Sequence, residues 1–159
     1  GKIRIKINEN IKLSNNDIYR YNNNLMLTSI DGDLFQIDIN GSVSKRKLGL
    51  SSNHKIYSNY NLAGIIDGNK LSNLKTSIDL AYGDYSIPRI FSYNKTKYIS
   101  IFDNQEKKIY LFDENLSLLN NFPLYSKSNI DLGNINKDNK LEIILVDDES
   151  SIRAYKIGN

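Results

Sequence analysis

The chain has 159 residues, of which 40% are hydrophobic and 25% are charged, a composition typical of a folded globular protein rather than a disordered one. It contains no cysteine and one histidine, which excludes disulfides, thiolate chemistry and any site that needs two imidazoles. The formal net charge of +3 is too small to indicate a nucleic-acid partner. No apolar run in the sequence is long enough to cross a membrane as a helix.

Strand patterns begin at the first residues and recur along the chain. Residues 2–7, 34–39 and 151–157 alternate between polar and apolar side chains, which predicts half-buried strands. The sequence contains 23 Asn and 23 Ile, residues that favour tight turns and strands respectively, although an AT-rich genome would enrich both. No segment of useful length has helical spacing, so we expect an all-β fold with very little helix.

Four segments share one pattern, in which an apolar strand, an acidic turn and a second apolar strand follow one another. The turn acids, spaced by 36, 36 and 44 residues, are Asp31, Asp67, Asp103 and Asp147. The four repeat cores lie near residues 25–39, 62–75, 98–113 and 130–157. A repeat of roughly 40 residues fits four short antiparallel strands with their turns, which is one blade of a β-propeller. We therefore predict that residues 1–159 form a single propeller-type domain, or a fragment of one, with about four blade-like repeats; a β-sandwich is the alternative.

The acidic turns are expected to join the two middle strands of each blade. Asp-Gly at 31–32 and at 67–68 is a pair that type I′ hairpin turns favour. Middle strands should be the most buried, so the predicted core includes Ile101, Phe102, Ile144 and Leu145. Residues 22–24 and 45–47 are polar and are predicted as loops. Residues 2–7 could complete the last blade, or the four repeats belong to a larger ring.

The last repeat carries a recognisable motif. Residues 130–145 read IDLGNINKDNKLEIIL, an apolar strand followed by a loop rich in Asn and Asp and a second apolar strand. This segment resembles the FG-GAP/VCBS repeat of integrin α-like propellers and bacterial surface proteins, whose pattern is GD-x-D/N-x-D-G-x-x-D/E between two strands. The resemblance extends through Tyr155, whereas the other repeats share only strand order and the turn. Hairpins such as residues 108–113 also resemble those of quinoprotein-type propellers.

The resemblance implies a calcium loop, because in this family the loop can hold Ca²⁺, a hard cation that takes six or more oxygen ligands. The positions that match the family's ligands are Asn134, Asn136, Asp138, the carbonyl of Lys140, and Glu142. Asn134 replaces the usual first acid and Asn139 the usual glycine, so only two carboxylates remain and the expected affinity is low. Asn139 can adopt the left-handed conformation that the loop needs. The alternative is a metal-free turn held by side chain-to-backbone hydrogen bonds.

The other reactive residues form no catalytic set, and no cofactor other than Ca²⁺ is predicted. His54 lies in a polar stretch without a partner pattern for acid–base catalysis, and we expect it to be exposed. Recurrence of the turn acid in every repeat indicates a structural role for the acidic run at 147–149. The basic run at 45–47 is expected to be solvated, and the sequence contains no nucleotide-binding motif.

Tyrosines cluster in the third repeat, where Tyr82, Tyr85, Tyr93 and Tyr98 fall within 17 residues. Loop tyrosines make amphipathic contacts at low entropic cost, so they can stack on a sugar or hold a protein. We predict Tyr82, Tyr85 and Tyr93 as partner-binding residues; packing between blades is the alternative use.

The resemblance implies a non-catalytic interaction or scaffold module that presents propeller loops to a protein or glycan partner. Such a module is expected to be secreted, periplasmic or on the cell surface. The alternative is an enzymatic propeller, quinoprotein-like or lyase-like, whose catalytic residues the sequence does not identify. Because residue 1 is Gly rather than Met, we expect the chain to be processed or cut from a longer protein.

Overall fold

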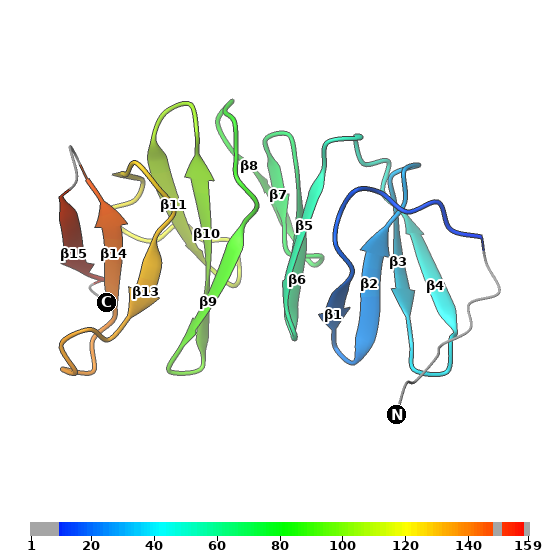
Figure 1. Cartoon of the computed structure of the whole chain (residues 1–159), viewed down its shortest axis with the longest axis horizontal. Helices are drawn as coiled ribbons and strands as arrows, with labels where there is room; N and C mark the ends of the chain where they lie inside the picture. Colours follow the sequence, from blue (N-terminus) through cyan, green and yellow to red (C-terminus); the bar gives the residue numbers. More distant parts are fainter. Residues whose placement is uncertain (1–9, 148–150, 158–159) are drawn as a thin grey trace. The chain divides into compact units, whose positions relative to one another are not determined.

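The computed structural model describes residues 10–147 and 151–157 (Figure 1). All regular secondary structure in these residues is β, with fifteen strands and no helix, which confirms the all-β prediction. This part of the chain accordingly has no helix that could cross a membrane. The strand predicted at residues 2–7 lies outside the described residues.

The strands form four sheets in which each strand pairs with the next along the chain. The first sheet contains β1 (Tyr19–Tyr21), β2 (Asn24–Thr28), β3 (Asp33–Ile37) and β4 (Val43–Lys47). The second contains β5 (Lys55–Asn59), β6 (Leu62–Asp67), β7 (Lys70–Ser72) and β8 (Ser77–Asp79). The third contains β9 (Arg89–Tyr93), β10 (Thr96–Asp103), β11 (Lys108–Asp113) and β12 (Leu124–Tyr125). The fourth contains β13 (Asp131–Gly133), β14 (Glu142–Val146) and β15 (Ile152–Lys156).

The chain divides into two compact units, Gly1–Ser77 and Ile78–Asn159. In the first unit, a buried cluster joins Met26 and Leu34 of the first sheet to Ile56, Ala63 and Ile65 of the second. The other face of the first sheet carries a separate small cluster, built around Leu27, Phe35 and Ile37. The two middle strands of this sheet, β2 and β3, therefore contribute alternate residues to two different packing layers, as the two-residue period of a strand requires.

The second unit is built in the same way. Its core combines Phe102, Ile109 and Leu111 of the third sheet with Ile130, Ile143 and Leu145, which belong to the fourth sheet and the segment before it. Burial of Ile101, Phe102 and Leu145 confirms three of the four predicted core positions. The prediction for Ile144 was wrong, since it is only half-buried. Ile144 lies on the opposite face of β14 from Ile143 and Leu145, because successive side chains of a strand alternate.

The hairpins differ from their predicted turn type. In the three four-stranded sheets the two middle strands are consecutive and antiparallel, as predicted. The fourth sheet has three strands among the described residues, and its acidic turn joins the middle strand β14 to the outer strand β15. Between β6 and β7, however, Gly68 has φ +59° while Asn69 does not have a positive φ, which is the pattern of a type II′ turn rather than type I′. Both central residues have positive φ at Asn22-Asn23 and at Asn94-Lys95. Type I′ geometry thus occurs between the first and second strands of the first and third sheets.

The prediction of a loop at residues 45–47 was also wrong. The basic run Lys45–Lys47 is not a loop but the end of β4, which is an edge strand whose charged side chains are exposed. Lys45 forms an ion pair of 2.7 Å with Asp33 and lies 5.3 Å from the ring centroid of Phe35. A basic edge strand discourages pairing with another chain, which gives the run a structural reason.

His54 is buried, not exposed, with 4% of its surface accessible. Its Nδ1 lies 2.6 Å from the carbonyl oxygen of Ser51, and its Nε2 lies 2.8 Å from Oγ1 of Thr28. Thr28 is in turn 2.7 Å from the hydroxyl of Ser14. One partner is the backbone of a neighbour in the sequence and the other is the distant Thr28, and together they allow a polar ring to be buried.

The two faces of β14 can be distinguished by substitution. Ile143 is fully buried, so Ile143→Ala should lower the free energy of unfolding by about 2–5 kcal/mol. Ile144 already contacts solvent, and Ile144→Ala should cost about 1 kcal/mol. Urea denaturation of both variants measures the difference, and a larger loss for Ile144→Ala would contradict the described register of β14.

Candidate functional site

The loop at residues 134–141 joins β13 to β14 and contains most of the predicted calcium ligands. Gly133 and Glu142 are directly opposite each other in the sheet, so the loop starts and ends at neighbouring positions of the two strands. The backbone N–H of Ile135 donates to Oε2 of Glu142 at 2.9 Å. Asn139 has φ +62°, which confirms that it takes the expected left-handed conformation.

Asp138 organises the exposed part of this loop. Its Oδ1 accepts from the backbone N–H of Lys140 at 2.9 Å. Its own N–H donates to Oδ1 of Asn136 at 3.1 Å, and the side-chain amide of Asn136 returns a hydrogen bond of 3.1 Å to Oδ2 of Asp138. The two bonds donated by backbone N–H groups are those of Asx turns, so the loop has a defined shape without a metal ion.

Lys156 supplies a positive charge to the same aspartate. Its Nζ lies 2.5 Å from Oδ2 of Asp138. The hydrogen bond from Lys156, followed by that from the backbone of Lys140, lowers the pKa of Asp138 to about 2. The pKa of Lys156 is raised, first by its hydrogen bond to Asp138. A lysine therefore contacts one of the two carboxylates that the sequence assigned to calcium.

Two buried oxygen atoms of the predicted ligand set accept no hydrogen bond. They are Oδ1 of Asn134 and Oε1 of Glu142, and the Glu142 side chain is only 4% exposed. Leaving a buried acceptor without a partner costs about 1–3 kcal/mol, and more for a charged group. Buried oxygens without partners, from a carboxylate and an amide, are the kind of ligand that a hard cation takes. Two oxygens of the predicted ligand set thus have the chemistry that Ca²⁺ requires, and the calcium site itself stays a prediction.

The predicted calcium site contains few carboxylates. Within the described residues, no group of three or more His, Cys, Asp or Glu could hold a metal ion. The predicted set contains only Asp138 and Glu142 as acids and depends on amide and carbonyl oxygens for the rest. Low charge of this kind lowers the affinity for Ca²⁺ toward the range of extracellular modules.

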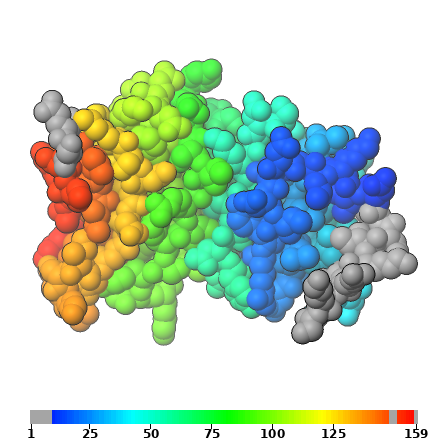
Figure 2. All heavy atoms as spheres, viewed as in Figure 1, coloured from blue at the N-terminus to red at the C-terminus, as the bar shows by residue number. Residues whose placement is uncertain are grey.

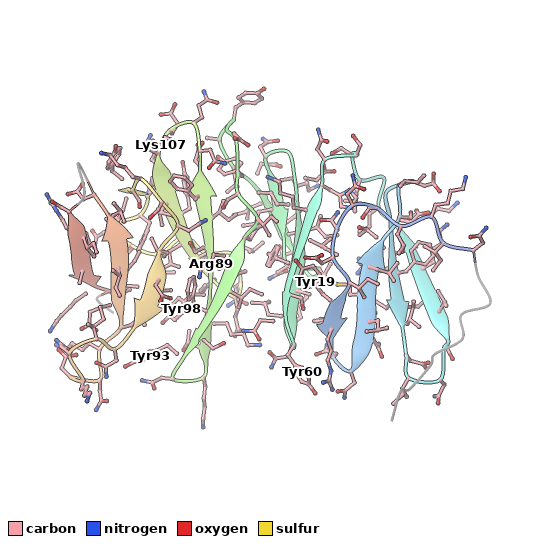
Figure 3. The ribbon with its side chains drawn as sticks, in the orientation of Figure 1. Tyr19, Tyr60, Arg89, Tyr93, Tyr98 and Lys107 are labelled. Carbon is pink, nitrogen blue, oxygen red and sulfur yellow. The ribbon has the colours of Figure 1, made fainter. Side chains whose placement is uncertain are left out.

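A pocket of about 550 Å³ adjoins this loop. From the hairpin of β9 and β10 it is lined by Tyr93, Asn94, Thr96 and Tyr98, and from the fourth sheet and its loop by Asn139, Lys140, Leu141, Lys156 and Ile157. Tyr93 and Tyr98 lie on the side of the hairpin that faces β13 (Figure 3). In the space-filling view the orange 134–141 loop and the green tip of the hairpin project as neighbouring protrusions (Figure 2). We call this hollow the tyrosine pocket.

The three tyrosines predicted to bind a partner occupy different environments. Tyr93 is half-buried and lines the tyrosine pocket, and Tyr82 is 91% exposed outside it. Tyr85 is 4% exposed, donates to the carbonyl of Ala81 at 2.7 Å and packs edge-on against Tyr110. Burial raises the pKa of Tyr85 to about 12. Its side chain belongs to the core and does not offer a surface to a partner.

Tyr98 lines the pocket although it was not among the predicted binding residues. Thr96 pairs with Tyr93 and Tyr98 pairs with Phe91, so the two tyrosines share one face of the hairpin. The sequence alone did not show this, because the faces follow from the register of the hairpin, which the positive-φ pair Asn94-Lys95 sets in the structure.

Three of the four turn acids, Asp67, Asp103 and Asp147, make hydrogen bonds or ion pairs within their own units. Asp67 accepts hydrogen bonds from the backbone and the hydroxyl of Ser51, and Asp103 accepts from the N–H groups of Gln105 and Glu106. Asp147 forms an ion pair with Arg153. These contacts agree with the structural role expected for the recurrent acids; residues 148 and 149 of the acidic run lie outside the described residues.

Comparisons with known proteins give a fold but no family. No family model and no curated protein matches the chain. Among solved structures, the chain is similar to one described as the crystal structure of the computationally designed Ika4 protein, with a TM-score of 0.56 and 14% identity over 99% of each chain. At this identity the likeness concerns the arrangement of the strands alone.

Calcium should raise the melting temperature if the 134–141 loop is a metal site. At about 1 mM calcium and a dissociation constant of about 10⁻⁴ M, linkage predicts about 1.4 kcal/mol of stabilisation. Thermal melts with calcium and with a chelator measure this shift. The shift should disappear in Asp138→Ala and increase in Lys156→Gln, which removes the cation that competes for Asp138.

Asp113→Ala is the matched control for this experiment. Asp113 caps a turn in the same unit by accepting from the backbone of Asn115 and of Ser117, each at 2.8 Å, so its loss should lower stability without changing the calcium shift. Equal melting temperatures with and without calcium in the unmodified chain would mean that the loop is an Asx turn only.

Proposed function

We propose that the chain is a non-catalytic binding module of the β-propeller type, in which the four sheets correspond to blades. The support is that each sheet is a meander of short strands with the most apolar strands in the middle, as a blade requires. The FG-GAP/VCBS-like motif at residues 130–145 supports the same assignment.

We propose a glycan as the ligand of the tyrosine pocket. The observation that carries this proposal is the pair Tyr93 and Tyr98 on one face of a hairpin beside the polar groups of Asn94, Thr96 and Lys140. A sugar ring presents an apolar face, which stacks on an aromatic ring, and a rim of hydroxyl groups, which bind amides, hydroxyls and ammonium groups. A pocket of about 550 Å³ has the size of a typical small-ligand site.

The calcium loop would form one wall of this binding site. Asn139 and Lys140 line the pocket and lie between Asp138 and Glu142 in the sequence. A cation held by those two carboxylates would therefore fix the part of the loop against which the ligand packs. Lys156 also lines the pocket, and its release from Asp138 on calcium binding would free its ammonium group for the ligand. A weak calcium site is filled where calcium is abundant, which favours a secreted or cell-surface location.

Glycan-array binding followed by titration tests this proposal. Tyr93→Ala should weaken binding of the selected glycan at least about tenfold, which corresponds to about 1.4 kcal/mol, because it removes a stacking surface. Tyr82→Ala removes an exposed tyrosine outside the pocket and should leave the affinity unchanged.

Two results would contradict the glycan assignment. One is the absence of binding to any glycan at millimolar concentration, which would favour a protein partner. The other is an equal loss of affinity in the Tyr82→Ala and Tyr93→Ala variants, which would place the ligand elsewhere on the unit.

A further inference from the structure

The first unit contains a second pocket, of about 440 Å³, between the first and second sheets. Residues from β4, from the segment after it, from β6 and β7, and from the segment leading into β8 line it. The pocket belongs to a different unit from the tyrosine pocket and shares no residue with it. We call it the cationic pocket because of the side chains at its rim.

Strand register explains which side chains enter this pocket. Arg46 lies opposite Leu34 on the neighbouring strand, and Leu34 belongs to the core between the two sheets; Arg46 is therefore on the inward face of β4. In the second sheet, Ile65 pairs with Ser72 and Asp67 pairs with Lys70. Since Ile65 faces the same core, these residues continue that face toward the hairpin. The pocket is the open end of the layer between the sheets.

Three cations surround the opening: Arg46, Lys70 and Lys75. Each is exposed, and none takes part in an ion pair among the described residues. The one carboxylate in the lining, Asp67, already accepts hydrogen bonds from the N–H of Ser51 at 2.9 Å and from the Ser51 hydroxyl. The lining therefore carries three positive charges and the single negative charge of Asp67, which leaves an excess of positive charge at the rim.

The floor of the pocket is apolar. Ile65 is 3% exposed, and Leu50 and Leu74 are half-buried side chains that pack against the same core. Ser72 lies beside them, with its hydroxyl donating to the carbonyl of Ile65 at 3.2 Å. A ligand that fills this space would bury an apolar body while its polar end remained near the cations.

Leu74 holds an unusual backbone conformation at this floor. Its φ of +68° is rare for a bulky side chain. The side chain of Asn73 maintains it, since Oδ1 of Asn73 accepts from the N–H groups of Lys75 at 3.1 Å and Thr76 at 2.9 Å. Backbone strain of this kind persists where the surroundings fix it and is frequent at ligand sites. Here it directs Leu74 toward the core and places Lys75 at the rim.

We propose that the cationic pocket binds a small amphipathic anion, an apolar body that carries a carboxylate, sulfate or sulfonate group. The apolar body contacts Ile65, Leu50 and Leu74, and the anionic group binds Arg46, Lys70 and Lys75. The volume is within the range of small-molecule sites. This assignment stands on residues of the first unit and is independent of the glycan proposal.

Isothermal titration calorimetry on the full chain tests the proposal with four probes of different chemistry. The organic anions naphthalene-2-sulfonate and decanoate should bind, with an affinity that falls as the salt concentration rises. The uncharged naphthalene-2-methanol and inorganic sulfate each lack one half of the recognised chemistry, and both should bind at least about tenfold more weakly.

Substitutions locate the binding to this pocket. The double variant Arg46→Gln/Lys70→Gln should weaken naphthalene-2-sulfonate binding at least about tenfold, whereas Lys47→Gln should leave it unchanged. Lys47 follows Arg46 in β4 and lies on the opposite face of the strand, so this control removes one charge outside the pocket. Arg46→Lys keeps the charge and should retain most of the affinity, and thermal melts establish that each variant is folded.

Three results would overturn the assignment. Equal binding of the uncharged probe would mean that the cations contribute nothing. An equal loss in Lys47→Gln would mean that net charge rather than the pocket attracts the anion. Failure of both organic anions to bind at millimolar concentration to the unmodified chain would show that this hollow is not a ligand site.

Discussion

The structure depends on one constraint: a short-stranded sheet cannot bury its own apolar face and needs a neighbouring sheet to cover it. In the first unit, Met26 and Leu34 meet Ile56 and Ile65 across this layer. In the second unit, Phe102 meets Ile143 in the equivalent way. The pairing register of these short strands must be correct, since a shift of one residue would expose every one of these side chains.

Both pockets follow from the same packing. The face of a strand that enters the core continues to the strand end, where the opposing sheet no longer covers it. Arg46 lies opposite Leu34 on the edge strand β4, and Tyr93 follows Phe91 on the same face at the end of β9. Side chains at these positions point inward without being needed for the core. The residue types at these positions can therefore vary without loss of the core. They are arginine and lysine in the first unit and tyrosine in the second.

Glycine and tyrosine show how closely one sheet is fitted. A Cβ on Gly64 would lie 1.9 Å from the carbonyl oxygen of Ser72 and 2.3 Å from the hydroxyl of Tyr57. Tyr57 lies directly opposite Gly64 in the sheet and donates to that same carbonyl at 2.7 Å. The ring covers the gap that the glycine leaves, a known way to stabilise glycine within a sheet. This contact also fixes Ser72, whose neighbours form the floor of the cationic pocket.

Sequence patterns predicted what depends on the chain alone. Alternation and the recurrent acidic turn were sufficient to predict an all-β chain and its middle hairpins, because side-chain period and turn spacing are local properties. Ile144 could not be assigned to the correct face from its neighbours. Residues 143–146 are all apolar, so polar and apolar side chains do not alternate there and the sequence does not show which face is buried. His54 and Tyr85 are buried because residues distant in sequence or across the sheet, Thr28 and Tyr110, receive them. The fold brings such partners together, so they cannot be identified from the residues adjacent in the sequence.

The 134–141 loop shows how far turn chemistry alone explains a sequence. Asx bonding accounts for Asn136 and Asp138, because each satisfies a backbone N–H of the loop. It does not account for Glu142, where one oxygen accepts from Ile135 and the other is buried without a partner. A leucine or valine at this strand position would avoid the cost of burying a carboxylate. Lys156 lies directly opposite Glu142 in the sheet. Its ammonium group is, however, bonded to Asp138. A divalent cation, unlike a lysine, can take oxygen ligands from both carboxylates at once, so the proposed calcium ion would give a physical reason for an acid at this buried position.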